Sequence, residues 1–231
     1  MSWLSSSSIG RKVVMSVTGT CLVLFLLFHA SMNIVAIFDS INHTDGYEII
    51  CEFLGANWYA LVGTVGLAFL VCVHFIYAFI LNAQNYRARG QERYAIPGRQ
   101  KEVEWASLNM LVLGIIIVLG LCLHLFNFWA KMQLPEILGY FPESGYELIE
   151  YNFSQWYYVV IYLIWLAALW FHLTHGIWSA MHTLGWNNNI WMNRWKCIAN
   201  IVATIIILMF ACVVIYFFGY SLNCGCACCC A

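Results

Sequence analysis

The sequence WFHLTHGIWSAMHTLGW, at residues 170–186, combines histidines with a run that is otherwise apolar. His172 and His175 lie one helical turn apart near the end of a segment long enough to cross a bilayer as a helix. A histidine in hydrocarbon is costly unless its ring nitrogens have partners, so an intramembrane histidine predicts a functional site. Three other apolar segments each carry one such residue: His29, His74 and His124.

The composition excludes an ordinary soluble domain. The chain has 231 residues, of which 63% are hydrophobic and 9% are charged, and its mean hydropathy is +0.77. The apolar residues form five blocks, each reaching the roughly 20 residues that a transmembrane helix needs. We therefore predict an all-α membrane protein, with a single five-helix bundle at residues 1–222 and a Cys-rich tail at residues 223–231. The expected helices cover residues 12–38, 58–82, 105–130, 153–182 and 195–220.

The charges indicate an orientation in the membrane. In this five-helix topology, every Lys and Arg except Lys131 falls on one side. Cytoplasmic loops carry an excess of Lys and Arg, so the N-terminus is expected in the cytoplasm and the C-terminus outside. The first apolar run is too long for a signal peptide and is expected to be a retained helix.

The four histidines fall into two predicted layers. At about 1.5 Å per residue, His29 and His124 lie roughly 25 to 28 Å from the cytoplasmic side, in the outer half of the membrane. His74 and His172 lie roughly 12 to 15 Å from that side, in the inner half. Asn33 follows His29 by one helical turn on the same face, where its amide could bind a buried polar group.

Two imidazoles from facing helices of a bundle are the axial ligands that a buried low-spin haem needs. Two such haems about 12 Å apart along the membrane normal would carry electrons across it. Copper or zinc is an alternative, although such sites usually add carboxylate or thiolate ligands. A non-haem transporter or scaffold is a further alternative, although a proton-coupled transporter would be expected to carry charged residues within its spans.

The sequence resembles the dihaem cytochrome b subunit of succinate:quinone oxidoreductases, of the five-helix type found in bacterial succinate dehydrogenases and fumarate reductases. Four of the five expected helices carry the resemblance. The matching pieces are HASMN from His29, HFIYAFILNAQNYRAR from His74, HLFNFW from His124 and HLTHGIWSAMHTLGW from His172. The resemblance implies a multi-pass protein of the bacterial cytoplasmic (inner) membrane, with a periplasmic C-terminus and two bound haems b.

The resemblance also implies roles for the histidines. His74 and His172 would be the axial ligands of the proximal haem, and His29 and His124 those of the distal haem. The spacing to the Leu-Gly pair at the end of the fourth helix fits His172 as the ligand rather than His175. His175 would then contact a propionate or quinone, or pack against its neighbours.

The same resemblance implies partners and a reaction. A cytoplasmic flavoprotein with FAD would interconvert succinate and fumarate, and an iron–sulfur subunit would exchange electrons with this chain. Menaquinone would react near the distal haem, so this chain would be the quinone-reactive subunit without acting on dicarboxylates itself. Glu48 and Glu52 are the candidates for the quinone site. Some fumarate reductases carry a transmembrane glutamate where this chain has Trp170, so a proton path through that position is not expected.

Two matters stay open at the level of sequence. A dihaem cytochrome b anchor of another respiratory enzyme, such as a hydrogenase or formate dehydrogenase, would carry similar haems with different soluble partners. The tail NCGCACCCA matches no metal-ligand spacing, although its cysteines are dense enough for metal binding, lipidation or disulfides.

Overall fold

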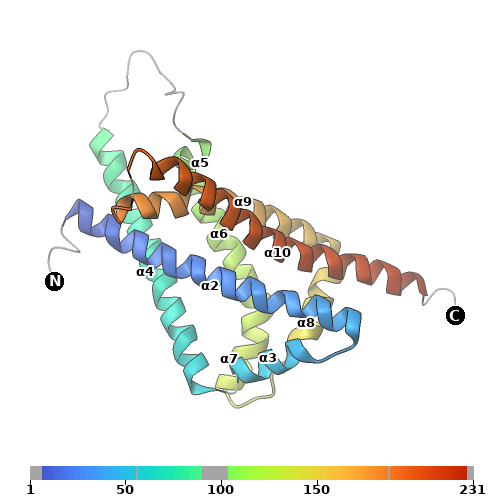
Figure 1. Cartoon of the computed structure of the whole chain (residues 1–231). Coiled ribbons are helices and arrows are strands. Elements are labelled where there is room, and N and C mark those ends of the chain that lie inside the picture. The colour runs from blue at the N-terminus through green and yellow to red at the C-terminus, as the bar shows by residue number, and fades with distance from the viewer. Residues whose placement is uncertain (1–6, 56, 90–103, 187, 228–231) are drawn as a thin grey trace. The chain divides into compact units, whose positions relative to one another are not determined.

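Every regular element that the structure describes is a helix (Figure 1). The computed structural model describes residues 7–55, 57–89, 104–186 and 188–227. Five helical segments in this part of the chain are long and apolar enough to cross a membrane, which indicates a multi-pass membrane protein. The all-α prediction with five candidate spans is therefore confirmed. The spans are Ser8–Asn42, Trp58–Ala88, Met110–Ile137, Trp156–Thr183 and Trp191–Asn223.

Four of the spans are single uninterrupted helices, as expected where no water is present to satisfy free backbone groups. They extend beyond the predicted bounds at most of their ends. The last one continues to Ala227, so the beginning of the Cys-rich tail is helical, whereas Cys228–Cys230 lie outside the described residues. These helices are α2 (Ser8–Asn42), α4 (Trp58–Arg89), α9 (Trp156–Thr183) and α10 (Trp191–Ala227).

The third span is interrupted. The short helix α5 (Trp105–Leu108) precedes it, and the span itself begins as α6 (Met110–His124). A single π-helical turn, η1 (Leu125–Trp129), follows directly after His124, and α7 (Ala130–Ile137) completes the span. The sequence predicted one continuous helix over residues 105–130, so the interruptions are a correction.

Two further short helices lie in the connections between the spans, the first of them where the spacing of Glu48 and Glu52 allows a short amphipathic helix. The first is α3 (Gly46–Gly55), and the second is α8 (Gly145–Ser154), whose first turn is capped by the Ser144 hydroxyl, which accepts from the backbone N–H of Glu147 at 3.3 Å. α8 packs against α3 and η1, and α3 also contacts α7. The predicted fourth span began at residue 153, but α8 ends at Ser154, and α9 begins only at Trp156.

Internal contacts divide the chain into two compact units, and every span contributes a segment to each. Unit 1 comprises residues Met1–Leu24, Gly66–Ile115 and Phe171–Ala203. Unit 2 comprises Phe25–Val65, Ile116–Trp170 and Thr204–Ala231. His74 and His172 therefore belong to unit 1, whereas His29 and His124 belong to unit 2.

The interior of unit 2 is rich in aromatic and branched residues. Phe217 is fully buried and Ile149 almost so, and Tyr162 packs in the same cluster. The interior of unit 1 contains smaller residues, with Ala199 and Ala203 fully buried and Thr18 buried. Large apolar side chains such as Leu24, Phe69 and Leu208 are exposed along the spans, as expected for helices that face lipid.

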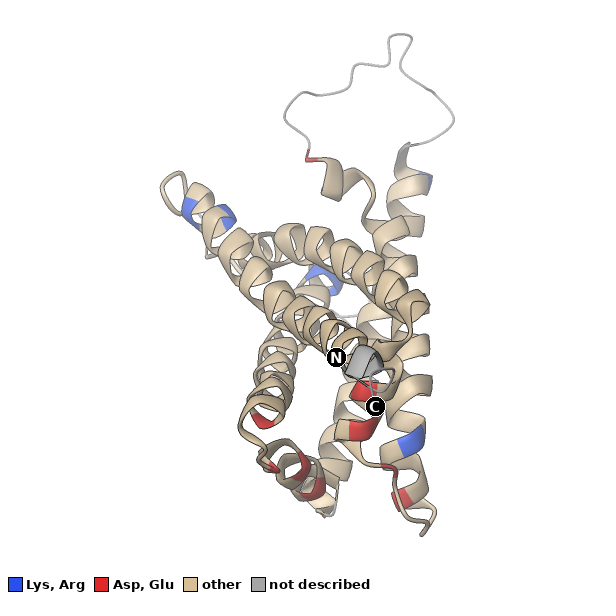
Figure 2. Ribbon diagram, turned by 90° about the vertical axis from the view of Figure 1, so that its right-hand side faces the viewer, with Lys and Arg blue, Asp and Glu red and all other residues tan. Residues whose placement is uncertain are grey.

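The charged residues, coloured by sign in Figure 2, divide between the two units by their residue ranges. Among the described residues, every Lys and Arg except Lys131 belongs to unit 1, and every Asp and Glu except Glu104 belongs to unit 2. Arg93, Arg99 and Lys101, which the orientation prediction also used, lie outside the described residues.

Candidate functional site

Unit 1 brings His74 of α4 and His172 of α9 together. Their ring centres lie 6.3 Å apart at an interplanar angle of 68°. Nδ1 of His74 lies 3.1 Å from Oγ1 of Thr18 on α2. Nδ1 of His172 is buried and has no hydrogen-bond partner among the described residues. A buried imidazole nitrogen without a partner calls for an explanation, and a bound group is one of the explanations.

Unit 2 brings His29 of α2 and His124 of α6 together. Their ring centres lie 5.9 Å apart at an interplanar angle of 78°. His29 stacks on Phe25 with 5.4 Å between ring centres and lies 5.6 Å from the ring of Phe210. Nδ1 of His124, like that of His172, is buried without a hydrogen-bond partner in the described part of the chain.

Aromatic side chains complete the surroundings of His124. The rings of Phe128, Trp165 and Tyr162 lie 5.1, 5.8 and 6.3 Å from its imidazole. Trp165 donates a 3.0 Å hydrogen bond from Nε1 to the carbonyl of Ile117, which fixes the indole against α6. This close approach requires Gly120, because a Cβ at that position would overlap the indole ring.

A polar chain leads from His29 towards α3. The Asn33 amide donates to the carbonyl of His29 at 2.8 Å, and its Nδ2 also lies 3.4 Å from Nδ1 of His29. The Tyr47 hydroxyl donates to Oδ1 of Asn33 at 3.4 Å, and the Tyr47 backbone N–H donates to Asp39 at 2.5 Å. Burial, followed by the neighbouring Cys51, raises the pKa of Tyr47 far above its ordinary value, so the phenol remains a hydrogen-bond donor.

The two acidic candidates for the quinone site differ in their surroundings. Both lie on α3 in unit 2, where Glu48 accepts a 3.0 Å hydrogen bond from the Ser144 hydroxyl and Glu52 is exposed. Cys51 lies between them in the sequence and is partly buried. Burial, together with the charge of Glu48, raises the pKa of the Cys51 thiol to about 11. A quinone role for either acid stays a prediction.

His175 belongs to a different cluster, which is centred on Glu104. Glu104 accepts from Nζ of Lys196 at 2.9 Å, from Nε1 of Trp178 at 3.2 Å and from Nδ1 of His175 at 3.4 Å. Lys196 also lies 4.8 Å from the centre of a Trp178 ring, in a cation–π contact. The cluster joins the residue that precedes α5 to α9 and α10, all within unit 1.

Trp170, where no transmembrane proton path is expected, donates from Nε1 to the Thr204 hydroxyl at 3.0 Å. The side chain thus has a polar partner on α10 within unit 2. His182, near the end of α9, is exposed.

Each histidine pair has a separation that suits a shared metal ion. Two imidazoles bonded to one ion at about 2 Å from opposite sides have ring centres on the order of 6 Å apart. The four histidines are only partly buried, so their rings are not fully packed by neighbouring side chains. There is also open space beside Gly176, one turn beyond His172, where an added Cβ would meet no atom within 4 Å. Among the described residues, no three His, Cys, Asp or Glu side chains are grouped as metal ligands. The donor set at each pair is therefore two imidazoles, which fits the axial positions of a haem.

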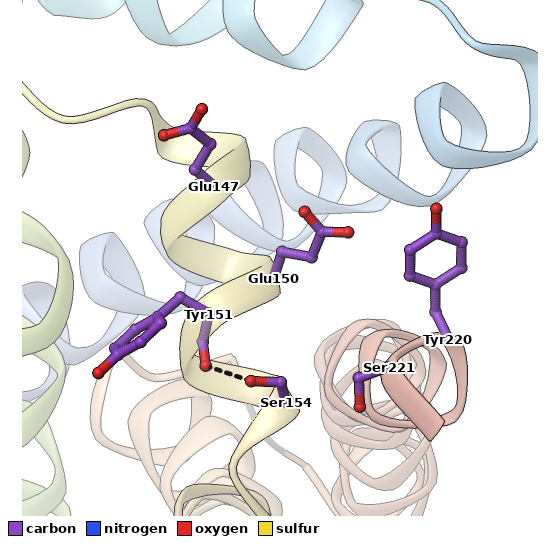
Figure 3. A pocket seen from close by; sticks show the side chains of 6 residues that line it. All are labelled: Glu147, Glu150, Tyr151, Ser154, Tyr220 and Ser221. Atoms are coloured by element: carbon purple, nitrogen blue, oxygen red, sulfur yellow. Dashed lines mark hydrogen bonds between the residues drawn. The ribbon is translucent and has the colours of Figure 1, made fainter. Parts of the chain in front are cut away.

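A shallow depression of about 360 Å³ lies elsewhere in unit 2, between α8 and α10 (Figure 3). The Ser154 hydroxyl on its wall donates to the carbonyl of Tyr151 at 2.8 Å. No histidine lines the depression, so it is separate from both pairs. Its lining residues are Glu147, Glu150, Tyr151, Ser154, Tyr220 and Ser221.

The sequence did not identify three of the contacts that shape these sites: Thr18 with His74, Trp165 with Gly120, and Glu104 with Lys196. The first could be expected from depth in the membrane, because Thr18 lies six residues beyond Lys12, or about 9 Å along the helix, close to the depth expected for His74. The other two depend on which faces of the helices meet, which spacing along one sequence does not give.

Comparisons with protein-family models, with curated proteins and with solved structures give no match for this chain.

Proposed function

We propose that this chain is the membrane anchor and electron-transfer subunit of a succinate dehydrogenase or fumarate reductase complex. In this proposal, the chain carries electrons between an iron–sulfur subunit and menaquinone by means of two haems b. The observation that carries the proposal is the meeting of four intramembrane histidines as two pairs, with ring centres 6.3 and 5.9 Å apart.

The donor chemistry supports haem over the alternatives. Each pair offers two imidazoles, which is a complete axial set for a low-spin haem but only half of a tetrahedral zinc site. The apolar rings around His29 and His124 suit a large flat macrocycle and exclude water from it. A bound haem would supply one-electron redox chemistry at each pair.

The side chains would position and insulate such groups. His74 and His172 would hold one haem, and His29 and His124 the other. Phe25 and Phe210 pack against His29 and would limit its rotation. Glu48 and Glu52 remain the candidates for exchanging protons with the quinone, which this chemistry needs because quinone reduction consumes protons.

The charge distribution supports an orientation. The basic residues of unit 1 are the ones that the positive-inside rule assigns to the cytoplasmic side. We therefore propose a cytoplasmic N-terminus and a periplasmic C-terminus in a bacterial cytoplasmic membrane. The flavoprotein with FAD and the iron–sulfur subunit would then bind on the cytoplasmic side.

The experiment is a redox-titrated visible spectrum of the purified membrane complex, with haem b quantified per copy of this chain. Two haems per chain with different midpoint potentials are expected. Absence of haem would overturn the proposal and leave a transporter or scaffold as the alternative. Two haems with hydrogenase or formate dehydrogenase subunits in place of the flavoprotein would retain the dihaem site and overturn the choice of complex.

A further inference from the structure

The contact between Thr18 and His74 sets this histidine apart from the other three. Thr18 lies on α2, is only 5% exposed, and places Oγ1 3.1 Å from Nδ1 of His74. Nδ1 of His124 and Nδ1 of His172 are buried without a partner among the described residues. Nδ1 of His29 faces an amide nitrogen, that of Asn33. In the described structure, Nδ1 of His74 has the Thr18 oxygen as a hydrogen-bond partner, and the backbone of Met15 also bonds to this ring.

The hydrogen bonds of Thr18 assign the direction of this contact. Its Oγ1 lies 2.8 Å from the carbonyl oxygen of Val14 and 3.1 Å from that of Met15. Carbonyl oxygens can only accept, so the single hydroxyl proton of Thr18 is directed to its own helix. The hydroxyl oxygen is then an acceptor towards His74, and Nδ1 of His74 carries the proton.

The assignment of that proton determines the nitrogen that can bind a metal. A neutral imidazole carries one N–H, so protonation of Nδ1 leaves the lone pair on Nε2. Gly19, beside Thr18, leaves room for the ring to approach α2, because a Cβ at that position would come within 3.2 Å of Cε1 and 3.7 Å of Nδ1 of His74. α2 therefore bonds to a histidine on α4 and favours one of its tautomers.

We propose that Thr18 is a positioning residue for the haem of unit 1. It accepts the Nδ1 proton of His74, holds Nε2 as the metal-binding nitrogen, and makes that nitrogen a stronger donor. A hydrogen bond of this kind to the outer nitrogen of a metal-bound histidine raises ligand basicity. A more basic ligand stabilises ferric over ferrous iron, so Thr18 lowers the midpoint potential of this haem. The inference rests on the proposed haem-binding function.

The test uses redox titration of the purified complex. Thr18→Val removes the hydroxyl while keeping the shape, and Thr18→Ser keeps the hydroxyl. The matched control is Thr20→Val, because the Thr20 hydroxyl donates only to the carbonyl of Ser16, at 2.8 Å, among the contacts of the described residues. In Thr18→Val, we expect a higher midpoint potential for the haem component that His74→Ala removes, with the other component unchanged. Thr18→Ser and Thr20→Val should both retain the wild-type potentials.

The inference would be overturned if Thr18→Val and Thr20→Val had equal midpoint potentials. It would also be overturned if Thr18→Ser raised the midpoint potential as much as Thr18→Val does. Thr18→Ala, which also lacks the hydroxyl, is titrated in parallel. It provides the same test if the valine variant is poorly inserted into the membrane. It should raise the same potential, and wild-type behaviour of Thr18→Ala would count against the inference.

A second readout separates this inference from the haem proposal. Nitrogen-15 NMR of the haem-free chain with labelled histidine reports which nitrogen of His74 is protonated. The Nδ1–H form is expected in the wild-type chain and in Thr20→Val, and a smaller fraction of it is expected in Thr18→Val, where only the Met15 backbone remains as an acceptor. An Nε2–H form in the wild-type chain would overturn the Thr18 assignment even if haem binds. An Nδ1–H form in a chain that never binds haem would support the hydrogen bond and overturn only the proposed function.

Discussion

The imidazole of His29 lies 5.9 Å from that of His124, although the two residues belong to α2 and α6. In unit 1, the corresponding neighbours are His74 and His172. The pairing of the rings defines which histidines would share a haem, and it leads to a prediction that does not depend on the identity of the soluble partners.

Replacing either member of one pair should remove the same spectral component. His29→Ala and His124→Ala are expected to abolish one haem, because a low-spin haem loses its stable coordination when one axial imidazole is lost. His74→Ala and His172→Ala should abolish the other. The measurement is the redox-titrated visible spectrum, with His43→Ala, in the exposed turn after α2, as the control. If His29→Ala and His74→Ala abolished one and the same component, the pairing would be wrong.

Glu104→Gln should destabilise unit 1 by about 1 kcal/mol, because the substitution keeps the shape but removes the charge that binds Lys196. Thermal unfolding of the detergent-solubilised protein measures the change. The matched control is Glu143→Gln, whose partner Lys131 is 3.8 Å away and whose side chain is 58% exposed. This control should change stability by less than about 0.5 kcal/mol. Equal effects of the two variants would contradict a stabilising role for Glu104.

The Glu104 contribution should also depend on pH. Burial alone would raise the pKa of Glu104, but the hydrogen bonds from Lys196 and His175 and the charge of Lys196 outweigh it and hold the pKa below its ordinary value of 4.5. A depressed pKa stabilises the folded state above the ordinary pKa, and that stabilisation is lost as the pH falls through the folded-state pKa. The stability difference between the wild type and Glu104→Gln should therefore be constant at neutral pH and shrink below about pH 4.5. A difference that grew on acidification would have the wrong sign.

Gly120→Ala should disturb unit 2, because the added Cβ would overlap the indole of Trp165. Overpacking of this kind typically costs about 1–3 kcal/mol, and the displaced indole should alter the spectrum of the haem proposed to bind at His124. Gly63→Ala is the control in the same unit, because a Cβ there meets no atom within 4 Å. The control should be neutral or stabilise its helix by up to about 1 kcal/mol. Similar unfolding temperatures for both variants would rule out the close approach at Gly120.

The Cys51 thiol should react slowly with an alkylating reagent at neutral pH. A pKa of about 11 instead of the ordinary 9.0 leaves on the order of 100-fold less thiolate, which is the reactive form. The labelling rate should rise with pH beyond 9 and level off only near 11. Glu48→Gln should increase the rate at a fixed pH, but only in part, because burial remains the larger cause.

The control for this labelling is a cysteine at an exposed position of the same helix. Ile49 is 62% exposed, so Ile49→Cys in a Cys51→Ser background provides it. This thiol should label much faster than Cys51 at neutral pH. Equal rates at the two positions would contradict the raised pKa of Cys51.

The long spans could be predicted from the sequence because hydrocarbon imposes one requirement on every residue in them. An apolar block of sufficient length can cross a membrane with all its backbone groups satisfied only as a helix or in a closed barrel. The same regularity gave the depths of the histidines, because each residue advances a straight helix by about 1.5 Å. His29 could thus be expected at the level of His124 before any contact was known.

The ends of the spans were harder to predict. In the sequence, the aromatic segment that includes Phe153 runs directly into the fourth span. In the structure, Gln155 has φ −91° and ψ 112°, and this extended residue separates α8 from α9. No Gly or Pro marks the break. The Glu104 cluster could not be predicted either. A charged residue next to an apolar segment is usually exposed to solvent, and its position alone predicts no partner. Its partner Lys196 comes from a different span, and single-sequence spacing does not relate the faces of two spans.

The π-turn η1 separates the helical register of α6 from that of α7. A π-turn holds one more residue than an α-turn, and each residue rotates a helix by about 100°. Loss of one residue from Leu125–Trp129 would therefore leave His124 facing its partner while rotating all of α7, which packs against α3. The turn lets the histidine-bearing part of the span keep its register while the segment beyond it acquires a new one.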